Sequence, residues 1–364
     1  MPQPPPSSRP GVAVGAFALV ALLVALAAAG VWWVQQDGDP SYSGASDAPE
    51  SPPASASDPS GATTAGSADT AAADDRRVVV ISVDGLGSLW VSRRATPGIA
   101  DLLAQGAGTL NARTEVEKTV TLPNHTGMVT GDRVDPVQGG HGVTWNSTST
   151  RSVALGTQSV FSVVDAAGGT SAVYAGKQKF EMWGRAWPGT IDPLEIDDQA
   201  SLVTDTVEDL RAGAHDLVFL HLAGPDNAGH EHGWGSPAYL DAVRTADADV
   251  DRVVSAVADD PALAEEVVVI VTADHGGVPG TTTHSDATQP ENFTIPFVVW
   301  GAGVTPGDLY DLNPDYRDPG SSQPSYDGPQ PVRNGDVANL VTDLLGLDPV
   351  PGSLFDTGHD LDVE

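Results

Sequence analysis

Several stretches of the chain are continuously apolar and rich in β-branched residues. They are 77–83 (RVVVISV), 216–222 (DLVFLHL), 265–273 (EEVVVIVTA) and 294–300 (TIPFVVW), with a shorter run at 171–176 (SAVYAG). Runs of this length and composition are typical of strands whose two faces are both buried, as in a parallel sheet. The pattern therefore predicts that these segments form the centre of a buried sheet.

Between these runs, apolar residues recur at helical spacing. The predicted helices lie within 95–107, 201–213, 236–260 and 334–347. Thr96 and Ser236 each precede a proline and are expected N-caps, Gly213 is an expected stop, and Asn334 or Asp336 is the expected cap of the last helix. Strands that alternate with helices predict an α/β domain with a mostly parallel central sheet and helices on both faces.

The amino-terminal part of the chain has a different composition. Residues 11–34 contain no charge, and about 20 apolar residues suffice to cross the hydrocarbon core of a bilayer. With Arg9 before this segment, the positive-inside rule places residues 1–10 in the cytoplasm and the rest of the chain outside it. We expect an uncleaved transmembrane anchor, and the alternative is a cleaved signal peptide that leaves a secreted protein.

Residues 35–75 consist mainly of Ser, Ala, Pro, Gly, Thr and Asp and offer almost nothing large and apolar to bury. Such a segment is expected to be a disordered linker. The folded domain is therefore predicted over 76–364. Within it, 305–330 is rich in Pro, Gly and Tyr and is expected to be a long loop.

The charge balance excludes one class of partner. The chain has 49 Asp and Glu against 17 Lys and Arg, a formal charge of -32, so we expect no binding to nucleic-acid duplexes. It has no cysteine, which excludes disulfides and thiolate metal ligands. Lysine is rare: Lys118, Lys177 and Lys179 are the three in the chain.

Acidic and imidazole side chains follow three of the predicted strands. They are Asp84 after the first strand, Asp226 and His230 after 216–222, and Asp274, His275 and the nearby His284 after 265–273. Ligands of open α/β sheets bind beyond the carboxyl ends of the strands, so these side chains are expected to converge. Carboxylates and neutral imidazoles are zinc ligands, and six of them suit two ions better than one.

The stretch 118–131, KTVTLPNHTGMVTG, places Thr121 just before a proline and a short Gly-punctuated segment. A threonine hydroxyl is a weak nucleophile until it is activated, and a metal ion beside it can do so. The start of a helix also attracts anions. We therefore expect Thr121 to be a nucleophile for phosphate esters.

Ordered motifs carry a family resemblance. VDG, TLPNH, HGVTWN, PDNAGHEHG and TADHGG resemble the alkaline phosphatase superfamily, in particular its type I phosphodiesterase/nucleotide pyrophosphatase branch. The resemblance implies an alkaline phosphatase-like fold and two divalent ions, most simply zinc. It also implies the roles of single residues: Thr121 is the nucleophile and shares one zinc with Asp84, Asp274 and His275, while Asp226, His230 and His284 hold the other, and Asn146 donates to a phosphoryl oxygen. His125, His141 and His232 are expected to be structural.

Lys177 or Lys179 is expected to neutralise phosphate oxygens that the zinc ions do not reach, and superfamily monoesterases with a threonine nucleophile carry a similar Lys-x-Arg pair. The alternative is a local salt bridge to Glu181 or another acid. The predicted function is hydrolysis of a small phosphate ester or nucleotide, of the phosphodiesterase/nucleotide pyrophosphatase type, through a phosphothreonine. One alternative is an alkaline phosphatase-type phosphomonoesterase. The other is a non-enzymatic surface protein, tethered to the membrane, on a decayed phosphatase fold.

Overall fold

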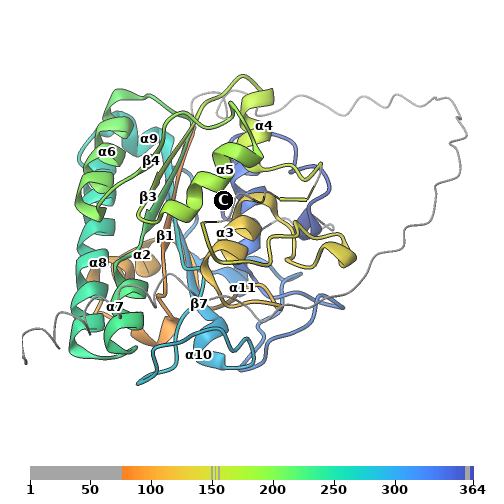
Figure 1. Cartoon of the computed structure of the whole chain (residues 1–364). Coiled ribbons are helices and arrows are strands. Elements are labelled where there is room, and N and C mark those ends of the chain that lie inside the picture. Colours follow the sequence, from red (N-terminus) through yellow and green to blue (C-terminus); the bar gives the residue numbers. More distant parts are fainter. Residues whose placement is uncertain (1–75, 149–150, 152, 155, 357–360) are drawn as a thin grey trace, which may run out of the picture. The chain divides into compact units, whose positions relative to one another are not determined.

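The computed structural model describes residues 76–148, 151, 153–154, 156–356 and 361–364 (Figure 1). The predicted cytoplasmic segment 1–10, anchor 11–34 and linker 35–75 lie outside these residues. None of the helices in the described part combines the length and the apolar character that a bilayer crossing requires.

One eight-stranded sheet forms the centre of the described part, in the order β4-β3-β5-β1-β6-β7-β2-β8. The strands are β1 (Arg77–Val83), β2 (Ala107–Arg113), β3 (Ser171–Ala175), β4 (Leu194–Ile196), β5 (Leu217–Leu222), β6 (Val267–Thr272), β7 (Thr294–Gly301) and β8 (Gly307–Asp308). β1 pairs in parallel with β5 and β6, and every residue of β5 and β6 is buried. The five predicted strands and the mostly parallel sheet are confirmed.

The strand β7 is antiparallel to its neighbours β6 and β2. A strand parallel to β6 would need a crossover connection that returns the chain to the amino-terminal end of β6. Here the connection 273–293 stays at the carboxyl edge of β6, where Gly276 N–H bonds to Asn292 O at 2.8 Å. The chain therefore enters β7 from that edge and runs back. Three strands, β2, β4 and β8, were not predicted, since none forms a continuous apolar run.

Helices cover both faces of the sheet. The helices are α2 (Pro97–Gln105), α3 (Thr121–Thr130), α4 (Val160–Ala166), α5 (Glu181–Ala186), α6 (Gln199–Ala212), α7 (Gly224–His232), α8 (Pro237–Ala258), α9 (Pro261–Glu266), α10 (Pro290–Phe293), α11 (Leu309–Leu312) and α12 (Val337–Leu344). Short 3-10 turns lie at η1 (Ser88–Trp90), η2 (Pro136–Gln138), η3 (Gln178–Phe180), η4 (Asn334–Asp336) and η5 (Leu354–Asp356). The helices α6, α7 and α8 lie on one face, and α3, α4 and α5 lie on the other (Figure 1). The layered α/β architecture is confirmed.

The predicted starts of α2 and α8 and the predicted stop of α6 are confirmed, but the side chain expected to cap α2 does not do so. Ser236 accepts the N–H of Tyr239 at the start of α8, and Gly213 adopts a left-handed φ of 60° that ends α6. The side chain of Thr96 does not cap α2. Instead, Asp247 in α8 accepts the N–H groups of Gly98 and Ile99 at 3.0 and 2.8 Å. A carboxylate from a packed neighbour therefore satisfies the orphan donors of α2.

The last predicted helix begins with a 3-10 turn. Residues 334–336 form the 3-10 turn η4, and the α-helix begins only at Val337. The Asp336 carboxylate accepts the N–H of Arg333 at 2.6 Å, which fixes the entry into this segment. Asn334 is buried and donates to Asn124 of α3.

The predicted loop 305–330 contains β8 and α11 and is held against the domain by two buried arginines. Arg113 donates to the carbonyl groups of Gly320 and Ser322 at 2.7 and 2.8 Å. Arg333 donates to Pro324 O at 2.7 Å. These bonds satisfy loop carbonyl groups and fix the path of the chain over the domain.

Candidate metal centre

The carboxyl edges of three adjacent strands carry the predicted metal ligands. Asp84 directly follows β1, Asp226 lies in the first turn of α7 after β5, and Asp274 follows β6. All three are buried, and β5, β1 and β6 are neighbours in the sheet. Because adjacent parallel strands end at one edge, residues far apart in sequence come together there.

The first group of ligating atoms consists of Asp226, His230 and His284, called here the histidine cluster. Asp226 Oδ1 lies 3.5 Å from His230 Nε2 and 3.6 Å from His284 Nε2. The two imidazole Nε2 atoms are 3.1 Å apart. Asp226 and His230 are four residues apart on α7, so one helical turn brings them to the same side.

The second group consists of Asp84, Asp226 and His275, called here the carboxylate cluster. His275 Nε2 lies 3.5 Å from Asp84 Oδ1 and 3.8 Å from Asp226 Oδ1. Asp274 Oδ2 lies 3.2 Å from the same nitrogen. Asp226 belongs to both clusters, so the two groups form one continuous centre.

Backbone carbonyl groups orient all three imidazoles. The contacts are His230 Nδ1 to Thr282 O at 2.9 Å, His284 Nδ1 to Thr119 O at 2.5 Å and His275 Nδ1 to Gly276 O at 2.9 Å. A carbonyl oxygen only accepts, so each Nδ1 carries the proton and each Nε2 presents a lone pair to the centre. Metal-bound histidines are commonly fixed in this way through the other ring nitrogen.

The atoms that face the centre lack other partners. Within the described part of the chain, Asp84 Oδ1, Asp226 Oδ1, Asp274 Oδ2 and His275 Nε2 are buried and make no hydrogen bond. Buried polar atoms without a partner are costly, and these four are all acceptors. A divalent cation would satisfy them together, and oxygen and imidazole donors fit zinc. The two clusters are therefore consistent with a metal site.

Electrostatics also favours the ligating form of His284. Burial lowers the pKa of His284 well below its usual range, and His275 and His230 reinforce this effect. Burial raises the pKa of the Asp274 carboxyl well above its usual range, and the charges of Asp84 and Asp226 act in the same direction. In the absence of a cation, the Asp274 carboxyl thus resists ionisation beside the charges of the other two carboxylates.

Lys177 lies between two of the carboxylates. Its Nζ donates to Asp84 Oδ2 at 2.6 Å and makes a very short contact with Asp226 Oδ2. Each carboxylate therefore gives one oxygen to Lys177 and turns the other towards His275. Burial opposes ionisation of Lys177, but Asp226 and Asp84 outweigh it and raise the pKa of the ammonium above its usual range.

His221 is a component of the centre that sequence reasoning missed. Its Nε2 donates to Asp84 Oδ2 at 2.8 Å, and its Nδ1 accepts the N–H of Gly176 at 3.2 Å. The signal was present as a polar residue inside the apolar run DLVFLHL of β5. Alternation along β5 places His221 on the face of the sheet where its ring contacts His125 of α3.

Thr121 begins α3 and is 1% exposed. Its carbonyl accepts a bond from His125 Nδ1 at 2.8 Å, and His125 Nε2 accepts one from Ser82 Oγ at 2.8 Å. The preceding Thr119 donates its hydroxyl to His284 O at 2.6 Å. The start of α3 is thereby fastened both to β1 and to the segment that carries a ligand of the histidine cluster.

Asn146 lies at the same end of α3. Its Oδ1 accepts the N–H of Leu122 at 3.0 Å and the ammonium of Lys179 at 2.8 Å. Burial, followed by the charge of Lys177, lowers the pKa of Lys179 to about 8. The structure thus gathers all the predicted site residues at one sheet edge, while their individual roles stay predictions.

Two other histidines lie apart from the ligating atoms. His141 is buried and accepts the N–H of Val143 at 3.0 Å. His232 is exposed and lies 3.7 Å from the carboxylate of Glu231.

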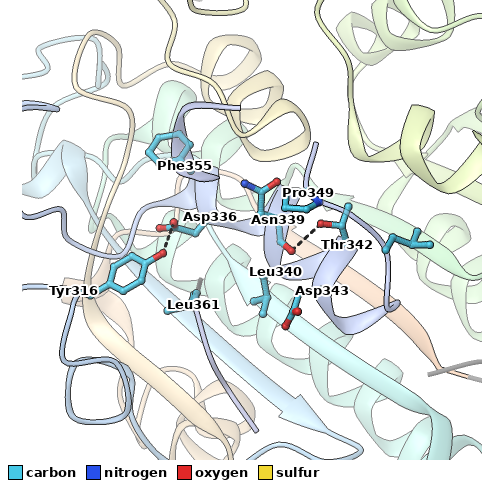
Figure 2. Close-up of a pocket in the computed structure, with 10 residues that line it drawn as sticks. Tyr316, Asp336, Asn339, Leu340, Thr342, Asp343, Pro349, Phe355 and Leu361 are labelled. Atoms are coloured by element: carbon cyan, nitrogen blue, oxygen red, sulfur yellow. Dashed lines mark hydrogen bonds between the residues drawn. The ribbon is translucent and has the colours of Figure 1, made fainter. Parts of the chain in front are cut away.

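A separate cavity of about 150 Å³ lies beside α12 (Figure 2). Tyr316 donates to Asp336 Oδ1 at 2.9 Å on one side of it, and Leu340 and Leu361 contribute apolar surface. None of the Asp and His residues of the two clusters lines this cavity. Figure 2 shows the bond from Tyr316 to Asp336 and a second bond from the Thr342 hydroxyl to the backbone carbonyl of Asn339.

Comparison with known proteins decides the family. A model of the type I phosphodiesterase/nucleotide pyrophosphatase family matches residues 78–327. The chain belongs to this family. The matched range includes every residue of both clusters as well as Thr121 and Asn146, so the resemblance inferred from the motifs is confirmed.

Solved structures show the same fold at low identity. Murine ectonucleotide pyrophosphatase/phosphodiesterase 5, in an inactive variant bound to AMP, is 14% identical with a TM-score of 0.56, and the match covers 76% of this chain and 96% of that one. The lipoteichoic acid synthase LtaP of Listeria monocytogenes is 14% identical with a TM-score of 0.53, covering 80% of this chain and 74% of that one. The alkaline phosphatase-like fold is therefore shared across this group.

A curated relative is more similar over a shorter segment. GPI ethanolamine phosphate transferase 1 of Yarrowia lipolytica is 31% identical over 153 residues, which is 40% of this chain and 16% of that protein. The corresponding protein of Neurospora crassa is 33% identical over 138 residues. The matched segment thus spans only about a sixth of the Yarrowia lipolytica protein.

Proposed function

We propose that this chain is a two-metal hydrolase of phosphate diesters and pyrophosphate bonds, of the nucleotide pyrophosphatase type, with Thr121 as its nucleophile. The single observation that carries the proposal is the pair of clusters that share Asp226, set beside the amino-terminal end of α3. Bound there, two divalent ions would lower the pKa of the attacking hydroxyl and neutralise charge that develops on the phosphoryl group.

The ligand sets come from the family resemblance, and the two clusters contain most of their members. Asp226, His230 and His284 would hold one ion, and Asp84, Asp274 and His275, together with Thr121, would hold the other, with Asp226 also close enough to face this second ion. Lys177 and His221 each bond to Asp84 Oδ2, so they orient this carboxylate and leave its Oδ1 towards the centre.

The remaining groups act on the substrate. The Thr121 hydroxyl gives up its proton and Oγ1 forms a bond to phosphorus. The bond from phosphorus to the leaving oxygen breaks, this oxygen takes up a proton, and a phosphothreonine results. Water then cleaves the phosphothreonine and restores the hydroxyl. Asn146 donates through Nδ2 to a non-bridging oxygen, and the amino-terminal end of α3 favours the anionic group electrostatically.

Relatives support parts of this proposal. The murine relative that is bound to AMP is an inactive variant with alanine in place of a threonine, which agrees with a threonine nucleophile and a nucleotide-like ligand. The ethanolamine phosphate transferases favour a second candidate, in which an alcohol replaces water as the acceptor of the phosphoryl group. A phosphomonoesterase is a third candidate, because Lys177 and Lys179 resemble the Lys-x-Arg pair of superfamily monoesterases. A non-enzymatic surface protein is disfavoured because a complete ligand set is retained.

We also propose that residues 11–34 anchor the chain in a membrane, with the catalytic domain outside the cytoplasm and 35–75 as its tether. The support is the uncharged apolar segment and its flanking charges. Membrane separation of the full-length chain tests it, and a mature protein that starts near Gly30 in the medium would show signal cleavage instead.

A substrate panel with matched variants tests the function. The zinc-loaded chain is given bis(p-nitrophenyl) phosphate, p-nitrophenyl phosphate and ATP, with and without an alcohol acceptor. Thr121→Ala should retain less than about a hundredth of kcat, a loss of about 2.7 kcal/mol of barrier stabilisation. The control is Thr126→Ala, one turn further along α3, whose hydroxyl bonds only to Leu122 O. Greater retention by Thr121→Ala would remove the nucleophile assignment.

A further inference from the structure

The two lysines of the segment 177–180 are held in a fixed turn after β3. Phe180 closes the turn, with its N–H bonded to Lys177 O at 3.2 Å, and its ring is fully buried. The ring packs against His221 and His125, with centroid separations of 4.5 and 5.0 Å. This anchor directs the stems of both lysines towards the centre and leaves Gln178 between them exposed.

The two ammonium groups have different partners. Lys177 is engaged by the carboxylates of Asp84 and Asp226. Lys179 Nζ lies 2.8 Å from Asn146 Oδ1. Lys177 thus forms a salt bridge with acidic side chains, which was one of the two expectations, whereas Lys179 contacts a neutral amide.

The contacts of Asn146 determine the orientation of its side-chain amide. Leu122 N–H and the Lys179 ammonium are both donors, and both point at the same atom. An amide oxygen has two lone pairs and can accept both bonds, whereas the amide nitrogen can accept neither. Oδ1 must therefore lie between these donors, and the NH2 group of Asn146 must point away from them.

We propose that Lys179 is a positioning residue that acts through Asn146. By holding Oδ1 together with Leu122 N–H, it keeps the Nδ2 donor of Asn146 aimed at a phosphoryl oxygen. This inference rests on the proposed function, because it needs a phosphoryl group beside Thr121. Lys179 does not neutralise the phosphate itself, so its contribution disappears when the Asn146 side chain is removed.

A double-mutant cycle on the full-length, zinc-loaded chain tests this coupling, with kcat/KM for bis(p-nitrophenyl) phosphate as the readout. Asn146→Ala should lose about a hundredfold, as for a donor to a developing oxyanion. Lys179→Met should lose about tenfold, and Lys179→Arg, which keeps a donor, should recover most of that loss. In the Asn146→Ala background, Lys179→Met should change the rate less than about threefold, because the partner is gone.

The control for loss of a positive charge is Arg93→Met, whose exposed ion pair with Asp101 lies outside the site; it should leave kcat/KM unchanged. A full tenfold loss from Lys179→Met in the Asn146→Ala background would show that Lys179 acts directly on the substrate. No loss from Lys179→Met in the wild-type background would also overturn the inference.

A second measurement needs no turnover and shows which idea has failed. The affinity of the zinc-loaded chain for inorganic phosphate, measured by calorimetry, should fall in Asn146→Ala and in Lys179→Met. The double variant should bind phosphate no more weakly than Asn146→Ala does. If Thr121→Ala abolishes turnover while the cycle is additive, the proposed function stands and the positioning role falls. If the wild-type chain neither turns over a phosphate ester nor binds phosphate, both fall.

Discussion

Glu115 is a buried carboxyl with a strongly perturbed environment outside the metal centre. Its side chain is fully buried, Oε1 has no partner among the described residues, and Oε2 makes a very short contact with the Tyr326 hydroxyl. The same hydroxyl lies 2.9 Å from Glu117 Oε2. A phenol has one proton and can donate to only one carboxylate, so a second proton on Glu115 is the arrangement that satisfies both contacts.

Burial raises the pKa of Glu115 from 4.5 to about 8, against the opposing bond from Tyr326. The folded chain therefore keeps a proton that the unfolded chain releases near pH 4.5. Stability from this group is complete below pH 4.5 and is lost as the pH rises through about 8. Over the interval from pH 5 to 8, at about 1.4 kcal/mol per pH unit, the expected loss is about 4 kcal/mol of unfolding free energy.

The perturbation is Glu115→Gln, which keeps the size and the acceptor oxygen but cannot ionise. Urea unfolding of the full-length chain at pH 5, 6, 7 and 8 gives the free energy for each protein. We expect the variant to gain on the wild type steadily with pH, by about 4 kcal/mol between pH 5 and 8. Other buried acids contribute equally to both curves and cancel in the difference.

The matched control is Glu208→Gln on the exposed face of α6, which should run parallel to the wild type. If the curves for Glu115→Gln and the wild type are also parallel from pH 5 to 8, Glu115 is ionised in the folded chain and the reasoning about its environment is wrong.

Further outcomes follow from the metal centre, the helix cap and the anchor. A chelator should inactivate the chain, zinc should restore it, and metal analysis should find about two ions per chain, whereas Asp226→Ala should weaken binding at both positions because both clusters use this carboxylate. If Asp226→Ala kept one tightly bound ion, Asp226 would not contribute to binding at both positions. Asp247→Ala should destabilise the fold by about 2 kcal/mol in urea unfolding, because two N–H groups of α2 lose their acceptor, whereas exposed Asp251→Ala should have little effect. External protease should release an active fragment by cutting within 35–75, and resistance of the full-length chain would count against a disordered tether.

The sequence by itself determined the central strands and the chemistry at their ends. The runs that became β1, β5 and β6 are apolar on both faces, and this leaves few alternatives to a buried parallel sheet. Once these strands are placed side by side, Asp84, Asp226 and Asp274 must meet at one edge. The candidate ligands could therefore be found without coordinates.

Other features were decided only by the tertiary structure, because they depend on contacts between distant segments. The cap of α2 comes from Asp247, about 150 residues along the chain, and no local pattern around Thr96 could indicate it. The direction of β7 depends on where the connection after β6 travels, not on the composition of the strand itself.

The different contacts of Lys177 and Lys179 were also decided only by the tertiary structure. Their spacing and rarity mark both lysines as unusual, but the sequence does not indicate that their side chains contact different partners. Only the packing of Phe180 and the positions of Asp84 and Asn146 send one ammonium to the carboxylates and the other to an amide oxygen. Partner choice among polar side chains is settled by distances of a few tenths of an ångström, which residue type and spacing do not encode.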